Sequence, residues 1–333
     1  MPSFDFEEQR IVKEIQRLNA KRVVLQMPQG LKPEAAKLAK LVEDAGAVAI
    51  ISSDPCYGAC DIALFEAESL GADLVLHFGH SNMVRDDNAH AIYIETHAKI
   101  DIESALQQAL PLLIDCKTVG LTTSVQHITT LTSAKQFLET AGKAVLIGDG
   151  GQLAHAGQVI GCNYSNPKAV ADQVDAFLFV GGGIFHALGI ALGTGKPVII
   201  ADPYDSRAYS ITDEAQKLLK HRYVSIMAAK DAKTFGILIG VKPGQKHLDH
   251  ALKAKAIAEK TGRTAYLMAG REITPDALME FPQFDAYVNT ACPRISLDAP
   301  GKFQKPILTV NEFMVLCGEI SWNDMIRKGL FEN

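Results

Sequence analysis

A strand pattern that recurs three times along the 333 residues is the feature that most constrains the fold of this chain. The pattern is a lysine followed by a short apolar run, and it begins at Lys21, Lys117 and Lys233. Apolar side chains recur at three- and four-residue steps before and after each run, which predicts a helix on either side. The second helix ends near an Ala-Gly or Thr-Gly pair, and such a glycine is typical of a helix C-cap. The sequence therefore predicts one structural unit built three times.

Three more strands complete each unit. A second strand follows the second helix, a third begins just after an aspartate, and a fourth comes shortly afterwards. The runs are continuously apolar rather than alternating, which is typical of parallel strands covered by helices on both faces. We expect an α/β fold of three related small parallel-sheet (Rossmann-like) domains, spanning residues 1–98, 99–209 and 210–333. Because ligands gather at the carboxyl ends of such strands, three domains around a pseudo-threefold axis would share one central cavity.

Composition and the N-terminal residues exclude several classes of protein. With 47% hydrophobic and 21% charged residues, the chain is typical of a globular protein. A net charge of −5 argues against a broad nucleic-acid surface, which needs a net basic face. The first residues carry acids and lack the apolar core of a signal peptide, and no apolar run reaches the ~18 residues of a membrane span. We therefore expect a cytoplasmic protein with no membrane partner and no direct nucleic-acid partner.

Three of the six cysteines occupy comparable places in the three units. Cys60 and Cys162 follow the second strands of the first and second units, and Cys292 follows the third strand of the third unit. Each lies past a strand end and close to a glycine or a proline, where a ligand-binding loop is expected. A disulfide framework is not expected in a cytoplasmic protein of this size. These three cysteines are therefore our candidate metal ligands.

The other cysteines have a different context. Cys116 precedes a strand and Cys317 lies in a late apolar segment, so both are expected to be plain thiols. Cys56 lies four residues before Cys60 and is consistent with an added ligand, with exchange with Cys60, or with neither role. The common radical S-adenosylmethionine signature, Cys-x3-Cys-x2-Cys, is absent because position 63 is Ala63.

The pattern of residues leaves the metal open. Three thiolates with one free position suit a catalytic zinc ion, which keeps a water position. They equally suit a [4Fe–4S] cluster that leaves one iron for the substrate. Thiolate sulfur is a good ligand for both metals, so spacing alone does not separate the two.

Six short segments, taken together, resemble the archaeal diphthamide synthase family, also called 2-(3-amino-3-carboxypropyl)histidine synthase. The resemblance covers roughly residues 10 to 315 and touches all three units. The segments are LQMPQGL at 25–31, YGACD at 57–61, LHFGHS at 76–81, GQVIGCNYS at 157–165, GGGIFH at 181–186 and ACPR at 291–294. The resemblance implies a homodimer. It implies that each subunit has three related α/β domains around one central [4Fe–4S] cluster, and that Cys60, Cys162 and Cys292 hold this cluster. The family does not require a cysteine at the position of Cys56.

The same resemblance implies the reaction. S-adenosylmethionine binds the fourth iron, and the reduced cluster cleaves the bond from sulfur to the γ-carbon of the methionine moiety. The 3-amino-3-carboxypropyl radical then adds to the imidazole C2 of a histidine of translation elongation factor 2, the first step of diphthamide biosynthesis. The implied partners are S-adenosylmethionine, the elongation factor and an electron donor. Two alternatives stay open: a zinc-dependent hydrolase or methyltransferase using the same cysteines, and a noncatalytic subunit that delivers electrons or binds the factor.

Several other residues near strand ends are candidates for binding S-adenosylmethionine or for chemistry. The cofactor-binding candidates lie past the first strands of two units and around a glycine run in the second unit: Gln26, Gln29, Gly30, Gln126, His127, Gly181, Gly182 and His186. Duty in turns or caps is the competing interpretation for them. His80 is the better candidate to face the cavity, whereas His77 is expected to pack in the interior. Arg294 would pair with a carboxylate, with an interdomain salt bridge as the alternative.

Overall fold

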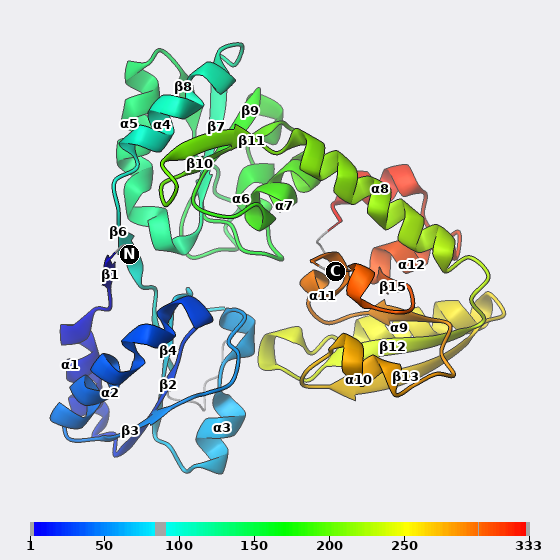
Figure 1. The fold of residues 1–333 in the computed structure, drawn as a ribbon, viewed down its shortest axis with the longest axis horizontal. Coiled ribbons are helices and arrows are strands. Elements are labelled where there is room, and N and C mark those ends of the chain that lie inside the picture. The colour runs from blue at the N-terminus through cyan, green and yellow to red at the C-terminus, as the bar shows by residue number, and fades with distance from the viewer. Residues whose placement is uncertain (1–2, 84–90, 299, 331–333) are drawn as a thin grey trace.

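The computed structural model of the chain describes residues 3–83, 91–298 and 300–330. It shows three small sheets that are predominantly parallel, each in its own part of the sequence and each flanked by helices (Figure 1). The α/β fold of three related parallel-sheet domains is therefore confirmed. The predicted boundary near residue 98 falls within the short strand β6, and the one near residue 209 falls within β11. The positions of the boundaries stay predictions.

The first domain has a four-stranded parallel sheet with the order β3-β2-β4-β5. Two helices, α1 and α2, bury apolar positions such as Ile11, Ile15 and Leu38 against one face, and α3 covers the other face. The strands are β2 (Arg22–Gln26), β3 (Val48–Ile51), β4 (Leu74–Phe78) and β5 (Ala91–Ile94); the helices are α1 (Glu8–Leu18), α2 (Ala35–Asp44) and α3 (Leu64–Ser69).

The second domain has a five-stranded sheet with the order β11-β10-β9-β7-β8. The four strands β10, β9, β7 and β8 repeat the parallel pattern, and β11 adds an antiparallel edge to β10. The strands are β7 (Thr118–Thr123), β8 (Ala144–Leu146), β9 (Ala176–Val180), β10 (Val198–Asp202) and β11 (Arg207–Ser210). The helices are α4 (Glu103–Ala109), α5 (Leu131–Thr140), α6 (Ser165–Lys168) and α7 (Phe185–Thr194).

The third domain has a four-stranded parallel sheet with the order β13-β12-β14-β15. The long helix α8 (Thr212–Ala228) runs from the second domain to the third (Figure 1). The strands are β12 (Thr234–Gly240), β13 (Thr264–Gly270), β14 (Ala286–Asn289) and β15 (Ile307–Thr309). The other helices are α9 (Leu248–Lys260), α10 (Pro275–Met279), α11 (Pro293–Leu297), α12 (Val310–Leu316) and α13 (Trp322–Lys328), of which α13 packs on α7 of the second domain.

One aspartate interaction is repeated in all three domains. The aspartate before each third strand accepts hydrogen bonds from the two backbone N–H groups at the start of the first strand, at 2.6–3.0 Å: Asp73 from Lys21 and Arg22, Asp175 from Lys117 and Thr118, and Asp285 from Lys233 and Thr234. These bonds lower the pKa of all three carboxyl groups, because they favour the charged form. The recurrence of this detail supports a true triplication.

The predicted glycine caps are confirmed. Gly46, Gly142 and Gly262 follow α2, α5 and α9 with φ values of 95°, 81° and 75°. This left-handed conformation is the one for which glycine carries no steric cost. Helix, glycine and next strand therefore follow one another in the same way in each domain.

The C-terminal part of the third domain is held by a buried ion pair. The guanidinium of Arg222 in α8 binds Glu312 in α12 through two hydrogen bonds of 2.7 and 2.6 Å, and both side chains are fully buried. Arg222 also donates to the backbone carbonyls of Ser296 and Ile307. The helix that enters the third domain is thereby joined to its last strand and to α12.

Two short antiparallel pairings were not predicted. β1 (Ser3–Asp5) pairs with β6 (His97–Lys99), and β11 pairs with β10. The first pairing joins the N-terminal segment to the segment that enters the second domain. Within the described ranges, no helix combines the length and apolar character needed to cross a bilayer.

Candidate metal centre

Cys60, Cys162 and Cys292 line one cavity of about 600 Å³. Cys60 lies in the short 3-10 helix η2 (Ala59–Asp61) that follows β3, and Cys162 lies in the loop between β8 and α6. Cys292 is the N-cap residue of α11, three residues beyond β14. The structure thus brings together one cysteine from each domain, and each comes from the strand end that the sequence indicated.

The pKa values of Cys162 and Cys292 are affected by burial and by the other cysteines of this group. Burial, followed by the nearby Cys60 and Cys292, raises the pKa of the Cys162 thiol to about 12. Burial also raises the pKa of Cys292 to about 11, and the pKa of Cys60 is raised for the same reason. The thiols are therefore protonated without a metal, and a bound cation would displace these protons.

The donor set fits a thiophilic metal. The described residues that line the cavity include three cysteines and two histidines, but neither an aspartate nor a glutamate. Hard cations such as Mg²⁺ or Ca²⁺ need oxygen ligands, whereas thiolate sulfur selects zinc or iron–sulfur clusters. The residues present therefore fit a [4Fe–4S] cluster, and they fit zinc equally well.

A loop of the third domain fixes Cys60. The 3-10 helix η6 (Pro243–Gln245) packs on η2, and Gln245 Nε2 donates a hydrogen bond of 3.3 Å to Cys60 Sγ. Gly244 approaches so closely that a Cβ there would lie 2.5 Å from the Cβ of Cys60. The first and third domains are therefore in direct contact at this ligand.

A buried lysine strengthens the same contact. Lys242 Nζ lies 3.2 Å from Asp61 Oδ2 and 2.8 Å from Glu272 Oε1. It also lies 4.3 Å from the ring centroid of Tyr57, which lines the cavity. Burial lowers the pKa of Lys242, but its bonds to Glu272 and Asp61 outweigh this and raise it, so the side chain stays charged. The lysine thus holds the residue next to Cys60.

Polar contacts also join the first and second domains beside the cavity. Gln126 Nε2 donates to the carbonyl of Gly79 at 2.5 Å, and Gln158 Nε2 donates to Ser81 Oγ at 2.9 Å. Glu95 lies 2.9 Å from His155 Nε2 and 3.1 Å from His97 Nε2. Burial alone would raise the pKa of Glu95, but the bonds from both histidines hold it at about 2. The cavity is therefore built at the junction of all three domains.

Four further predicted residues line this cavity: His80, Gln126, His186 and Arg294. Burial lowers the pKa of both His80 and His186 to about 4, so both imidazoles are neutral at pH 7. Arg294 binds Asp298 one helical turn along, at 2.6 Å, and its guanidinium lies 4.4 Å from the ring centroid of Phe185 in the second domain. The interdomain salt bridge considered for Arg294 is therefore wrong, because the ion pair lies within one short segment of the third domain.

Gln26, Gln29 and Gly30 do not line the cavity. Gln26 is buried and its amide makes hydrogen bonds through both atoms: Nε2 donates to the carbonyl of Asp61 at 2.5 Å, and Oε1 accepts from the N–H of Ala63 at 2.9 Å. It thus supports the loop that carries Cys60. Gln29 and Gly30 are exposed in the 3-10 helix η1 (Gln29–Glu34). Gln26 is therefore a strand residue that supports a loop, and the turn interpretation describes only Gln29 and Gly30.

His127, Gly181 and Gly182 also lie outside the cavity lining. His127 is buried, with its ring 5.4 Å from that of Tyr204. A Cβ on Gly181 would meet His127, and one on Gly182 would meet Tyr204. These residues pack together at the carboxyl end of β9, next to the cavity rather than on its wall. His77 is fully buried behind His80, as expected.

Sequence reasoning missed Lys242 and Gln245. A signal was available, because both follow the first strand of the third domain, as Gln126 follows the first strand of the second. Gln158 was also missed, although it lies in the segment GQVIGCNYS. All three residues act across domain boundaries or support loops, and neither role has a local sequence pattern.

The fold and the site together define a class of protein. It is a three-domain α/β protein in which three thiols, suited to a thiophilic metal, lie where the domains meet. Residues 27–327 match the family model described as "Putative diphthamide synthesis protein". The chain belongs to this family.

Individual relatives agree with this assignment. The chain is 38% identical to the 2-(3-amino-3-carboxypropyl)histidine synthase of Pyrococcus horikoshii, over 94% of this chain and 91% of that protein. It is 30% identical to 2-(3-amino-3-carboxypropyl)histidine synthase subunit 1 of Homo sapiens, over 97% of this chain and 74% of that one. The crystal structure of Dph2 from Pyrococcus horikoshii with a 4Fe–4S cluster matches with a TM-score of 0.89 and 36% identity, covering 96% of this chain and 93% of that chain.

Proposed function

We propose that this chain is an iron–sulfur transferase, a 2-(3-amino-3-carboxypropyl)histidine synthase. In this proposal it moves the 3-amino-3-carboxypropyl group of S-adenosylmethionine to the imidazole C2 of a histidine of translation elongation factor 2. The single observation that carries the proposal is the meeting of Cys60, Cys162 and Cys292 in one cavity, one from each domain. The family membership and the 4Fe–4S cluster of the similar Pyrococcus horikoshii protein support it.

The three cysteines would hold a [4Fe–4S] cluster through their thiolates. When bound and reduced, such a cluster supplies the electron that breaks the sulfur–γ-carbon bond of S-adenosylmethionine. Three protein ligands for four irons leave one iron for the substrate. Cys56 does not line the cavity, so the count of three does not depend on it.

Arg294 is the proposed partner for the carboxylate of S-adenosylmethionine. Its Nε and Nη2 bind Asp298, and Nη1 makes no hydrogen bond to any other described residue. A guanidinium presents donors on several edges, so it binds a second carboxylate while keeping the first. The stacking on Phe185 fixes the plane of the group, which orients the methionine moiety.

His80, His186 and Gln126 are the proposed polar contacts for the rest of the cosubstrate. The lowered pKa values of the two histidines keep both rings uncharged at pH 7. A neutral ring accepts or donates a hydrogen bond without adding repulsion against the positive sulfonium. Gln126 is already held by the carbonyl of Gly79, so its amide oxygen is available as an acceptor at a fixed position.

The remaining parts of the proposal concern partners. The protein substrate is a translation factor, which locates the reaction in the cytoplasm. An external donor reduces the cluster, and the active form is a homodimer. The similarity to synthases over more than nine-tenths of the chain supports these assignments.

Anaerobic purification and spectroscopy test the metal. We expect a brown protein with about four irons per chain and a spectrum that changes when S-adenosylmethionine is added. Zinc bound by three sulfurs in a colourless protein would support the zinc-dependent hydrolase or methyltransferase instead. X-ray absorption at the iron and zinc edges separates the two outcomes.

A transfer assay tests catalysis. Reduced protein is incubated with elongation factor 2 and S-adenosylmethionine labelled in the aminocarboxypropyl group, and label is sought on the target histidine. Cluster without label would favour a noncatalytic subunit, a role that the names of the eukaryotic relatives, "subunit 1", make worth testing. Label in a lower amount with Arg294→Lys protein, at equal iron content, would support the proposed carboxylate contact.

A further inference from the structure

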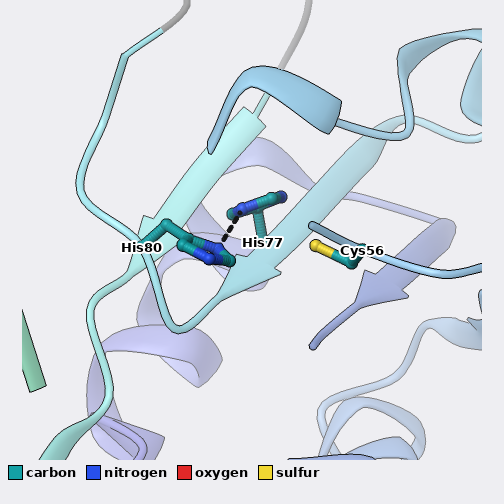
Figure 2. A group of neighbouring side chains, drawn as sticks. All are labelled: Cys56, His77 and His80. Atoms are coloured by element: carbon teal, nitrogen blue, oxygen red, sulfur yellow. Dashed lines mark hydrogen bonds between the residues drawn. The ribbon is translucent and has the colours of Figure 1, made fainter. Parts of the chain in front are cut away.

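A second group of metal-ligating side chains lies beside the three-thiol centre. The ligand atoms of Cys56, His77 and His80 all lie within 4.8 Å of one another. Figure 2 shows the two imidazole rings side by side, with the Cys56 sulfur turned towards them. Cys56 and His77 are buried, while His80 lines the cavity. The group therefore has one side in the protein interior and one side on the cavity.

The hydrogen bonds fix which nitrogen of His77 carries its proton. The amide of Gln26 has a defined orientation, because its Nε2 donates to the Asp61 carbonyl and its Oε1 accepts from the N–H of Ala63. His77 Nδ1 lies 2.7 Å from that same Oε1, so Nδ1 must be the donor. In a neutral imidazole, Nε2 then carries only a lone pair.

This lone pair faces His80. His77 Nε2 lies 2.9 Å from His80 Nδ1, so His80 donates its proton to His77 in the ion-free protein. A histidine whose distal nitrogen donates to an amide or carboxylate oxygen, and whose other nitrogen is bare, is the form in which histidine binds metals. Gln26 therefore prepares His77 as a ligand.

We propose that Cys56, His77 and His80 bind a divalent cation of the zinc type, at a site separate from the three-thiol centre. One thiolate and two imidazoles suit Zn²⁺, whose catalytic sites keep three protein ligands and one open position. On binding, the Cys56 thiol releases its proton to solvent. His80 ligates through Nδ1 once its proton resides on Nε2, and the ion takes the place of the proton between the two rings.

The site would connect the loop that leads to a cluster ligand with the end of a neighbouring strand. Cys56 lies in the loop that leads to Cys60, and His77 is in β4, with His80 two residues beyond its end. A bound ion would join that loop to the end of β4. His80 lines the cavity, so the open coordination position would face the cavity. An ion bound by one thiolate keeps a net positive charge beside the place proposed for the sulfonium, so this position would hold an anionic donor such as hydroxide, which cancels that charge.

The test uses the full chain with its cluster reconstituted under anaerobic conditions. One equivalent of zinc sulfate is added, weakly held metal is removed with a mild chelator, and iron and zinc are counted by mass spectrometry. Zinc K-edge absorption then reports the ligands without interference from iron. We expect about one zinc per chain, with one sulfur at ~2.3 Å and two nitrogens at ~2.0–2.1 Å.

Two variants and a matched control assign the ligands. Cys56→Ala should weaken zinc binding at least ~100-fold, since loss of an outer contact alone costs ~10–100-fold, and it should leave the iron content unchanged. His80→Ala should weaken zinc binding similarly; because His80 lies on the cavity wall, this change spares the core. Cys116→Ala, which changes a thiol at the start of a different strand, should bind zinc as the unchanged chain does.

Several results would overturn the site: no zinc in the iron-loaded chain, zinc binding insensitive to Cys56→Ala, or a zinc shell without one sulfur and two nitrogens. These results differ from failure of the proposed function, which appears as a chain without iron or without transfer. A zinc shell with three sulfurs would count against both.

Discussion

Gly244 lies directly against the backbone of Cys60 across the boundary between the third and first domains: a Cβ at position 244 would lie 2.6 Å from the Cα of Cys60. Real Cβ atoms do not approach other atoms this closely, so one of the two loops would have to move. The backbone at Gly244 is not in the left-handed region, so the requirement for glycine comes from contact alone. The third domain therefore helps to position a ligand that belongs to the first.

Gly244→Ala should lower the iron content of the reconstituted protein. The added methyl group pushes on the backbone of Cys60, and a metal site tolerates little displacement of a ligand. Iron per chain and visible absorption measure the effect. Gly301→Ala is the matched control, because a Cβ at Gly301 meets nothing within 4 Å and iron should stay unchanged. Equal iron in both variants would contradict the role given to Gly244.

Cys60→Ala, Cys162→Ala and Cys292→Ala should each lose the cluster and the transfer activity. Each removes one of three thiolates that share the cavity, and two thiolates leave a cluster with too few anchors. Iron analysis and the transfer assay check the outcome. Cys116→Ala should keep both properties, and Cys56→Ala should keep its iron. An intact cluster in any of the first three variants would contradict the ligand assignment.

Arg222→Met should lower the free energy of unfolding by ~3–5 kcal/mol, because it leaves the buried carboxylate of Glu312 without a charged partner. Urea unfolding measures the change. The control is Arg17→Ala, which breaks an exposed pair with Glu14 and should cost ~1 kcal/mol or less. The double variant Arg222→Met with Glu312→Leu should recover part of the loss, since it removes the unpaired charge. A single variant as stable as the parent would show that the pair is not needed.

Protein stability should fall as the pH drops below about 6.5, and His127 should contribute to this fall. Burial lowers the pKa of His127 to about 4 in the folded chain, against about 6.5 for an exposed histidine. Between these pH values the unfolded chain binds a proton at this histidine that the folded chain does not bind. The contribution of neutral His127 to stability is therefore complete above about pH 6.5 and is lost towards pH 4.

Unfolding of the metal-free chain at several pH values, beside His127→Leu, measures this contribution. The parent chain should lose free energy of unfolding as the pH falls from about 7 to about 5, and the variant should lose less over the same range. A stability difference between the two chains that is constant with pH would mean that His127 keeps its ordinary pKa in the fold.

Much of the fold was predictable because the repeat gives three independent readings of each element. The continuous apolar runs mark strands such as β9 and β12, and Gly46, Gly142 and Gly262 mark the helix ends. The β1–β6 pair, which forms a sheet of its own, and the edge strand β11 were not predictable, since strands of three or four residues have no distinctive periodicity. Their pairing depends on which segments the rest of the fold brings together.

The candidate site was predictable in its cysteines and less so in its other residues. Cys60, Cys162 and Cys292 follow strand ends, which parallel sheets direct to one edge. Gln26 also lies at a strand end, but its side chain points into the protein and supports the Cys60 loop. Position along the chain does not distinguish these two directions. Lys242 and its partner Asp61 meet across a domain boundary, and sequence order alone does not place one domain against another.

The position of Cys292 in its domain differs from the positions of Cys60 and Cys162 in theirs, so the three cysteines do not follow the symmetry of the repeat. Cys60 and Cys162 follow the second strands of their sheets, whereas Cys292 follows the third strand of its sheet. A trimer assembled from identical copies of one unit would be obliged to offer all three sulfurs from the same strand end. Fusion into a single chain removes that obligation, so one copy was free to move its sulfur to another loop. The centre therefore has a distinct side, and a substrate that is itself asymmetric can be bound there in a single orientation.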